Sequence, residues 1–464
     1  MAEKKIYAGY PTADLLEGLE PKSKRHKLLW GDTMIVAPDS PAGGPYVKVT
    51  CRGLTGHVLR SQTQPDHLLD LIFLDVGQGD SAVLVTPRGQ RVLIDFGQSD
   101  NTFRYLRWRY RDLKEVPFAA AILSHADEDH YGGLERFCRE GDRDAAKFRF
   151  ATLFHSGLVD TASPSVGGYY TNLETDRARF EDACRRAGEG KRKGGPAGVR
   201  GILQRALACG RIGDLRSLSA DDGELPGLEP TRDFRIEVLG PLRSRDAEGQ
   251  PRLAALPGGF NKTKNGHSVV LKITYGKVRI MLGGDLNSPA QKLLLAHYGD
   301  GLEGPAAIAA ARRRLEVDVA KAFHHGSDVD TRPDFFQAMN PVATVISSGD
   351  DEAHSHPRAD ALGTIGKHSR GPRPLIFCTE LARSSGDLTR HPQVRQKLAG
   401  KAPATGRTAR ARDRELDRAI SRYGAINLRT DGRRMLFAQR VERGNQWDVY
   451  ELVPDKSGEW KLAS

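Results

Sequence analysis

Four residues able to bind a metal ion lie within six positions of this 464-residue chain. His125, Asp127, Asp129 and His130 follow the apolar run from Phe118 to Ser124 and precede a Gly-Gly pair. Two imidazoles and two carboxylates at this spacing would repel or desolvate one another unless a cation joined them. Any one of them alone is more often a surface or capping residue. Together they predict a metal site at the end of a strand.

A second polar segment, Asp75-Val76-Gly77-Gln78-Gly79-Asp80-Ser81, ends an earlier strand-like run. The two segments together closely resemble the metallo-β-lactamase-type domain of the ComEC class of DNA-uptake proteins, which carries DVGQGDS-like and SHxDxDHxGG-like motifs. In the wider superfamily the second ligand is usually His, and Asp127 is the ComEC-type variant. The resemblance spans roughly residues 70 to 360, the length of one large domain, and implies an αββα sandwich.

The resemblance also implies roles for polar residues at later strand ends. Asp285, in Gly-Gly-Asp, would bridge two metals, and either His324 or His325 would supply the last ligand. Strand alternation leaves that choice open, because adjacent side chains point to opposite faces. Asp95 would support the loop from His125 to His130, called the metal loop below, from behind the ligands. Asp80 could support the metal loop in a similar way. The alternative, that it is an ordinary carboxylate at the end of a strand, has equal weight.

These residues predict a site for two divalent cations, Zn²⁺ or Mn²⁺, ~3.5–4 Å apart and sharing a hydroxide that attacks phosphorus in line. Asp127 in place of an imidazole makes the site harder and more anionic, which helps Mn²⁺ without deciding the metal. A histidine would protonate the leaving oxygen. The predicted metal ligands are His125, Asp127, Asp129, His130, Asp285, His324 and His325, and the predicted catalytic residues are Asp129, His325 and His356.

Two further segments match the family less specifically. Ser347-Ser348-Gly349, followed by His354-Ser355-His356-Pro357, resembles the S-x-G and HP elements on the substrate side, although an exposed His-rich loop is the alternative. Asn265-Gly266-His267-Ser268 resembles an N-N-x-S element. His267 occupies its variable position, which favours a loop residue over a ligand.

The chain divides into four predicted parts. Residues 1–25 form a polar arm, and short β-prone runs with Gly/Pro turns predict a small SH3-like β-barrel at 26–64. Residues 65–360 form the α/β sandwich, with a polar insertion or lid at 155–232. Residues 361–464 form a basic segment followed by strands that complete or pack on the sandwich.

Composition limits the functional class. The net charge of +11 favours a polyanionic partner, and we expect nucleic acid, DNA rather than RNA. No apolar run approaches the ~20 residues that span a bilayer, and no apolar signal core opens the chain. We therefore expect a cytoplasmic protein without a membrane role, so transport is not inherited from the resemblance. Five scattered cysteines without a C-x-x-C pair predict reduced thiols.

Three functions remain open from the sequence. The first is a metal-dependent nuclease or phosphodiesterase that cleaves DNA. The second is a small-molecule metallo-hydrolase acting on a nucleotide phosphodiester, thioester or lactone, because one fold hosts many chemistries. A narrow pocket closed by residues 155–232 would favour it. The third is a non-catalytic nucleic-acid-binding module.

Overall fold

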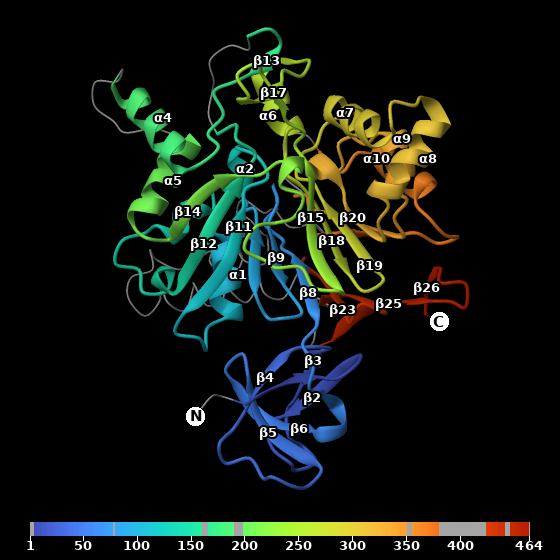
Figure 1. Cartoon of the computed structure of the whole chain (residues 1–464). Helices are drawn as coiled ribbons and strands as arrows, with labels where there is room; N and C mark the ends of the chain where they lie inside the picture. Colours follow the sequence, from blue (N-terminus) through green and yellow to red (C-terminus); the bar gives the residue numbers. More distant parts are fainter. Residues whose placement is uncertain are drawn as a thin grey trace, which may run out of the picture.

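The computed structural model describes residues 4–77, 79–159, 166–189, 198–349, 355–379, 424–440 and 446–463. Figure 1 shows a large sandwich of two sheets with helices on its outer sides, and a small all-β unit formed by the N-terminal residues next to it. The last strands of the chain lie between these two parts, beside the first sheet. Among the described residues, no helix combines the length and the apolarity needed to cross a membrane.

The first sheet of the sandwich has the strand order β14-β12-β11-β10-β9-β8-β23-β24-β25-β26. Pairing is parallel from β10 through β11 and β12 to β14, and antiparallel elsewhere. The strands are β8 Leu69–Phe73, β9 Ala82–Val85, β10 Arg91–Ile94, β11 Val116–Ile122, β12 Phe148–His155, β14 Ile212–Ser217, β23 Ile426–Thr430, β24 Met435–Arg440, β25 Trp447–Pro454 and β26 Trp460–Leu462.

The second sheet has the order β15-β18-β19-β20-β21-β22. A hairpin at Tyr275-Gly276-Lys277 joins β18 to β19, as predicted, and pairing is parallel from β19 to β22. Apolar side chains of both sheets, among them Leu71, Ile122, Ile273 and Val345, form the core between them. The strands are β15 Phe234–Gly240, β18 Val270–Tyr275, β19 Val278–Leu282, β20 Val319–Lys321, β21 Ala343–Ile346 and β22 Leu375–Cys378.

Helices cover the outer face of each sheet. Phe103, Phe180 and Leu203 pack on the first sheet, whereas Leu294 and Phe335 pack on the second. The predicted αββα architecture is therefore present. The helices outside the first sheet are α1 Asn101–Arg109, α3 Leu134–Phe137, α4 Arg177–Glu189 and α5 Gly198–Ala208, and those outside the second are α7 Ser288–Tyr298, α8 Gly304–Leu315, α9 Pro333–Met339 and α10 Ala359–His368.

The N-terminal unit is a seven-stranded antiparallel sheet, and it corrects the predicted polar arm at residues 1–25. Strands β1 and β2 lie inside that range, and Ala8, Ala13 and Leu15 are fully buried in the core of the unit. Charged neighbours such as Asp14 obscured this short alternation. The SH3-like character of the unit stays a prediction. The strands are β1 Lys5–Ala8, β2 Thr12–Leu16, β3 Arg25–Leu29, β4 Thr33–Val36, β5 Tyr46–Cys51, β6 Leu54–Leu59 and β7 Thr63–Gln64.

The predicted insertion at residues 155–232 is largely part of the sandwich. Strand β14 pairs in parallel with β12 at the edge of the first sheet, and α4 and α5 pack on its outer face. Two short amphipathic helices before a short strand made the segment look polar. The basic stretch Lys191–Lys193 lies outside the described residues.

The sandwich also continues beyond residue 360, the boundary expected from the sequence. Strand β22 closes the second sheet, and β23 pairs with β8 to extend the first. The C-terminal strands therefore complete the sandwich, one of the two predicted arrangements. Most of the basic segment between β22 and β23 lies outside the described residues. None of the five cysteines, all of which lie in the described residues, forms a disulfide.

Candidate metal centre

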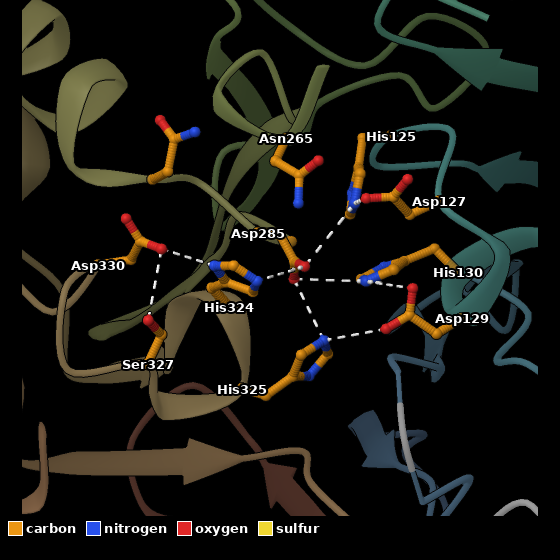
Figure 2. A network of polar contacts seen from close by, with 12 residues as sticks. His125, Asp127, Asp129, His130, Asn265, Asp285, His324, His325, Ser327 and Asp330 are labelled. Atoms are coloured by element: carbon orange, nitrogen blue, oxygen red, sulfur yellow. Dashed lines mark hydrogen bonds and ion pairs between the residues drawn. The ribbon is translucent and has the colours of Figure 1, made fainter. Parts of the chain in front are cut away.

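The predicted site residues lie just after strands, at one edge of the sandwich. Asp95 follows β10, and His125 follows β11 in the first sheet. Asp285 follows β19, and the His324-His325 pair follows β20 in the second sheet. Since the two sheets face each other, the carboxyl ends of these strands deliver the side chains to a common point (Figure 2).

Asp95 organises the metal loop, as the sequence predicted. Its Oδ1 accepts a hydrogen bond from the Ser124 backbone N–H at 2.7 Å, and its Oδ2 accepts one from the Ser124 hydroxyl at 2.7 Å. The same Oδ2 lies 3.0 Å from His130 Nδ1. This contact places the ring proton on Nδ1 and leaves the Nε2 lone pair for a ligand. The loop residues then continue into the single-turn helix α2, Glu128–Tyr131.

Four imidazoles converge on the carboxylate of Asp285. Their Nε2 atoms lie 3.7 Å (His125), 3.3 Å (His130), 3.6 Å (His324) and 3.4 Å (His325) from its oxygens. Figure 2 shows Asp285 between the rings, with the two metal-loop histidines on one side and His324 and His325 on the others. Asp285 therefore occupies the central position that the sequence assigned to a bridging ligand.

His325 and His324 differ in their surroundings. His325 is buried, its Nδ1 donates to the Ser347 carbonyl at 2.9 Å, and its Nε2 lies 3.5 Å from Asp129 Oδ2. His324 has a side chain 21% exposed, and its Nδ1 lies 2.6 Å from the carboxylate of Asp330. Both residues have positive φ, 46° and 55°, so the chain turns sharply and both rings face the cluster. Strand alternation, which predicted opposite directions, does not apply here because the pair lies in the 3-10 turn Phe323–Gly326.

The donor set fits a metal ion. Four buried atoms, namely Nε2 of His125, His130 and His325 and Oδ1 of Asp285, have no hydrogen-bond partner. Buried polar atoms are rarely left in this state, and each one costs about 1–3 kcal/mol. Among the described residues, four groups of potential ligand atoms lie close enough together to share an ion. They are His125, His130 and Asp285; Asp129, His130 and His325; Asp80, Asp95 and His130; and Asp80, Asp285 and His325.

The charges of the cluster also favour cations. Burial alone would lower the pKa of His325, but Asp285, Asp129 and Asp80 raise that pKa to about 10. Burial opposes the ionisation of Asp285, yet the surrounding histidines hold its pKa well below the usual range. The carboxylates thus favour positive charge at the position where the imidazole lone pairs meet, as expected for a metal centre.

Asp127 lies at the rim of the cluster. Its Oδ2 is 3.3 Å from His125 Nε2, and its Oδ1 forms an ion pair with Lys264 of helix α6, Gly259–Gly266. Burial opposes its ionisation, but His125 and Lys264 lower its pKa to about 2. Among the described residues, none of the four close groups of potential ligand atoms includes Asp127.

The remaining predicted residues lie at different distances from the cluster. The ring of His356 is centred 5.7 Å from that of His324 and 6.5 Å from that of His325, at the edge of the site. Asp80 is close behind His325, 3.6 Å from its Nδ1, and pairs with Lys321 at 2.5 Å. His267 is turned away, with its Nε2 2.8 Å from the Ala254 carbonyl. His354 lies outside the described residues.

Sequence reasoning missed several polar residues around the cluster. Asp330 holds His324, Lys264 holds Asp127, and Ser268 Oγ accepts from the Asp285 backbone N–H at 3.2 Å. Asn265 carries a buried Oδ1 without a hydrogen-bond partner, and Figure 2 shows its side chain directed into the cluster. The N-N-x-S resemblance marked the segment of Asn265 and Ser268. No sequence signal pointed to Lys264, because α6 meets the metal loop only in the tertiary structure.

Comparisons with known proteins agree with this geometry. The family model described as the metallo-beta-lactamase superfamily matches residues 74–157, which include Asp95 and the metal loop. ComE operon protein 3 of Bacillus subtilis (strain 168) is 24% identical over 315 residues, 64% of this chain and 30% of that protein. Competence protein ComA of Neisseria gonorrhoeae is 27% identical over 108 residues, 23% of this chain and 14% of that protein.

The chain thus spans less than a third of the length of these two relatives. A solved structure of a diphosphatase from the PhnP family aligns with 67% of this chain and 94% of its own, at 10% identity. Its TM-score of 0.32 is too low to support an argument. Residues 74–157 thus match the metallo-beta-lactamase superfamily model, and the chain is similar in sequence to two competence-related proteins.

Proposed function

We propose that this protein is a metal-dependent phosphodiesterase that cleaves DNA. The observation that carries the proposal is the convergence of buried lone pairs on Asp285, three imidazole Nε2 atoms and one carboxylate oxygen, all without hydrogen-bond partners. A hydrolase fold whose ligand atoms converge after the ends of three strands, β11, β19 and β20, is suited to divalent cations.

The proposed ligands form two halves that share Asp285. The His125 half contains His125 and Asp127, and the His325 half contains Asp129, His130 and His325. Bound Mn²⁺ or Zn²⁺ would supply an activated water and positive charge opposite the phosphate. Asp95 and the Ser347 carbonyl keep the protons of His130 and His325 on Nδ1, so both rings offer Nε2. His356, at the edge of the site, is the proposed donor of a proton to the leaving oxygen.

Three observations support DNA as the substrate. The chain has a net charge of +11, which favours phosphate backbones. Its relatives are named as a protein of the ComE operon and a competence protein, and the sequence resembles the DNA-uptake class. In residues 155–232, β14 extends the first sheet and α4 and α5 pack on its outer face, so these elements do not form the lid that would favour a small-molecule substrate.

The test is cleavage of end-labelled single- and double-stranded DNA and RNA by metal-free protein supplied with Mn²⁺ or Zn²⁺. We expect DNA to be cut in the presence of metal, and the variant Asp129→Ala/His130→Ala to be inactive. A small phosphodiester serves as the parallel substrate. Cleavage of that compound with intact nucleic acids would support the small-molecule hydrolase instead, and metal-independent DNA binding without cleavage would support the non-catalytic module. The cytoplasmic location stays a prediction.

A further inference from the structure

Lys264 is a cation held directly on a proposed metal ligand. It lies in the last turn of α6, its side chain is only 12% exposed, and its ammonium pairs with Asp127 Oδ1. The other oxygen of Asp127 faces His125 Nε2 at 3.3 Å. The carboxylate of Asp127 therefore pairs with a fixed positive charge through one oxygen and faces the position where a metal would bind through the other.

The two halves of the centre consequently differ in charge. In the His325 half, Asp129 faces His130 at 3.9 Å and His325 at 3.5 Å, and Asp285 Oδ1 lies 3.3–3.4 Å from the same two rings. Asp129 and Asp285 thus both face the rings of His130 and His325. In the His125 half, the charge of Asp127 is balanced by Lys264, and the other donors are His125, the buried Asn265 Oδ1 and the shared Asp285. The buried Lys321 beside the His325 half pairs with Asp80, which is not one of the proposed ligands.

A cation that pairs with a ligand carboxylate reduces what a divalent ion gains by binding to that carboxylate. At the His125 half, an incoming ion must also approach a partly buried ammonium, and the low local dielectric strengthens that repulsion.

We propose that Lys264 makes the two metal positions unequal, so that the His325 half binds one ion tightly and the His125 half binds a second ion weakly. This inference rests on the proposed two-metal hydrolase. Lys264 acts through Asp127 and is a positioning residue, which controls how much metal the centre holds at a given concentration. The weak position then fills only when metal is abundant, or when an anionic group draws the ammonium away from Asp127.

The test is titration of the metal-free full-length protein with Mn²⁺, followed by equilibrium dialysis with metal analysis and by electron paramagnetic resonance. We expect one tightly bound equivalent and a second one with weaker affinity, with spin coupling between ions appearing only as the second binds. Lys264→Gln should tighten the second equivalent by about tenfold, the order expected for removing one ion-pair charge from a partly buried site. Lys264→Arg should keep the wild-type difference.

Lys262→Gln is the matched control, because Lys262 lies exposed on the same helix two residues away. It should leave both affinities unchanged. Thermal melting shows whether each variant is folded, and Lys264→Arg provides a readout if Lys264→Gln is not. Two equivalents of equal affinity in the wild type, or an unchanged second affinity in folded Lys264→Gln, would overturn the inference. DNA cleavage is not a readout here, so unequal metal binding without nuclease activity would reject the proposed function alone.

Discussion

Two buried clusters of charge in this molecule have opposite designs. The metal centre gathers carboxylates and imidazoles whose lone pairs converge without hydrogen-bond partners. The arginine cluster, where the N-terminal unit meets the first sheet, consists of Asp32, Asp70, Arg52, Arg109 and Arg429. There, each carboxylate faces two guanidinium groups. The first cluster offers ligand atoms to an added cation, whereas the second pairs its carboxylates with guanidinium groups of the chain itself.

We therefore expect the metal centre to determine metal binding and the arginine cluster to determine folding stability. Arg429, 1% exposed, pairs with Asp32 at 2.7 Å and with Asp70 at 3.3 Å, and donates to the Leu29 carbonyl at 3.2 Å. It joins residues about four hundred positions apart in the sequence. Buried ion pairs can hold two parts of a fold together. Removing one partner is strongly destabilising, because the other charge stays buried without a counter-charge. The metal-ligating atoms of the metal centre, in contrast, add to the free energy of unfolding only when a metal ion binds to the folded protein.

The largest effect is expected from Asp285→Asn. Loss of the charge shared by both halves of the metal centre should reduce phosphodiester cleavage by about 10³-fold or more, the order lost with a principal electrostatic element of catalysis. Metal content should fall in parallel, while the unfolding free energy of the metal-free protein should not decrease. Steady-state cleavage, metal analysis and urea unfolding measure the three quantities. Strong destabilisation of the metal-free variant would contradict the comparison.

The opposite pattern is expected from Arg429→Met. Because Asp32 and Asp70 lose a buried partner, we expect the unfolding free energy to fall by about 3–5 kcal/mol. Metal content of the folded fraction should stay at the wild-type value. Arg433→Met, at an exposed position of the same hairpin, is the control and should change stability little. Equal unfolding midpoints for the two variants would show that the arginine cluster does not fasten the parts together.

Metal addition should stabilise the protein through the metal centre alone. At a free Mn²⁺ concentration a hundred times the dissociation constant, the unfolding free energy should rise by about 2.7 kcal/mol. Chemical unfolding with and without a chelator measures this gain. Asp285→Asn should lose it, and Arg429→Met should retain it. A similar gain in Asp285→Asn would place the stabilising ion elsewhere.

The smallest effect concerns acid. Burial opposes the ionisation of Asp32, but Arg52, Arg429 and Arg109 lower its pKa from 3.8 to about 2. A lowered folded-state pKa contributes stability that is complete above the unfolded value and is lost as the pH falls towards 2. The contribution is about 2 kcal/mol. Unfolding free energies measured between pH 5 and pH 2 should therefore fall more steeply for the wild type than for Asp32→Asn, and parallel curves would contradict this origin.

Much of the metal centre follows from local sequence. The loop from His125 to His130 was identified because it places four potential ligands within six residues, whereas the roles of Asp95 and Asp285 were implied by the family resemblance. The sandwich was predicted from its apolar runs and the family resemblance. The prediction of a polar arm at the N-terminus was wrong. The strand that contains Ala13 and Leu15 is short and has charged residues around its buried positions, so the sequence shows no clear alternation of apolar and polar residues.

The sequence by itself determined the ligand types, their order along the chain and the layers of the fold, because these depend on side-chain chemistry and local periodicity. Only the tertiary structure decided which atoms meet. The turn at His324 and His325 directs both rings to Asp285, α6 brings Lys264 onto Asp127, and Arg429 reaches Asp32. These contacts join elements far apart in sequence, and their geometry is fixed by how the sheets and helices pack, which no local pattern records.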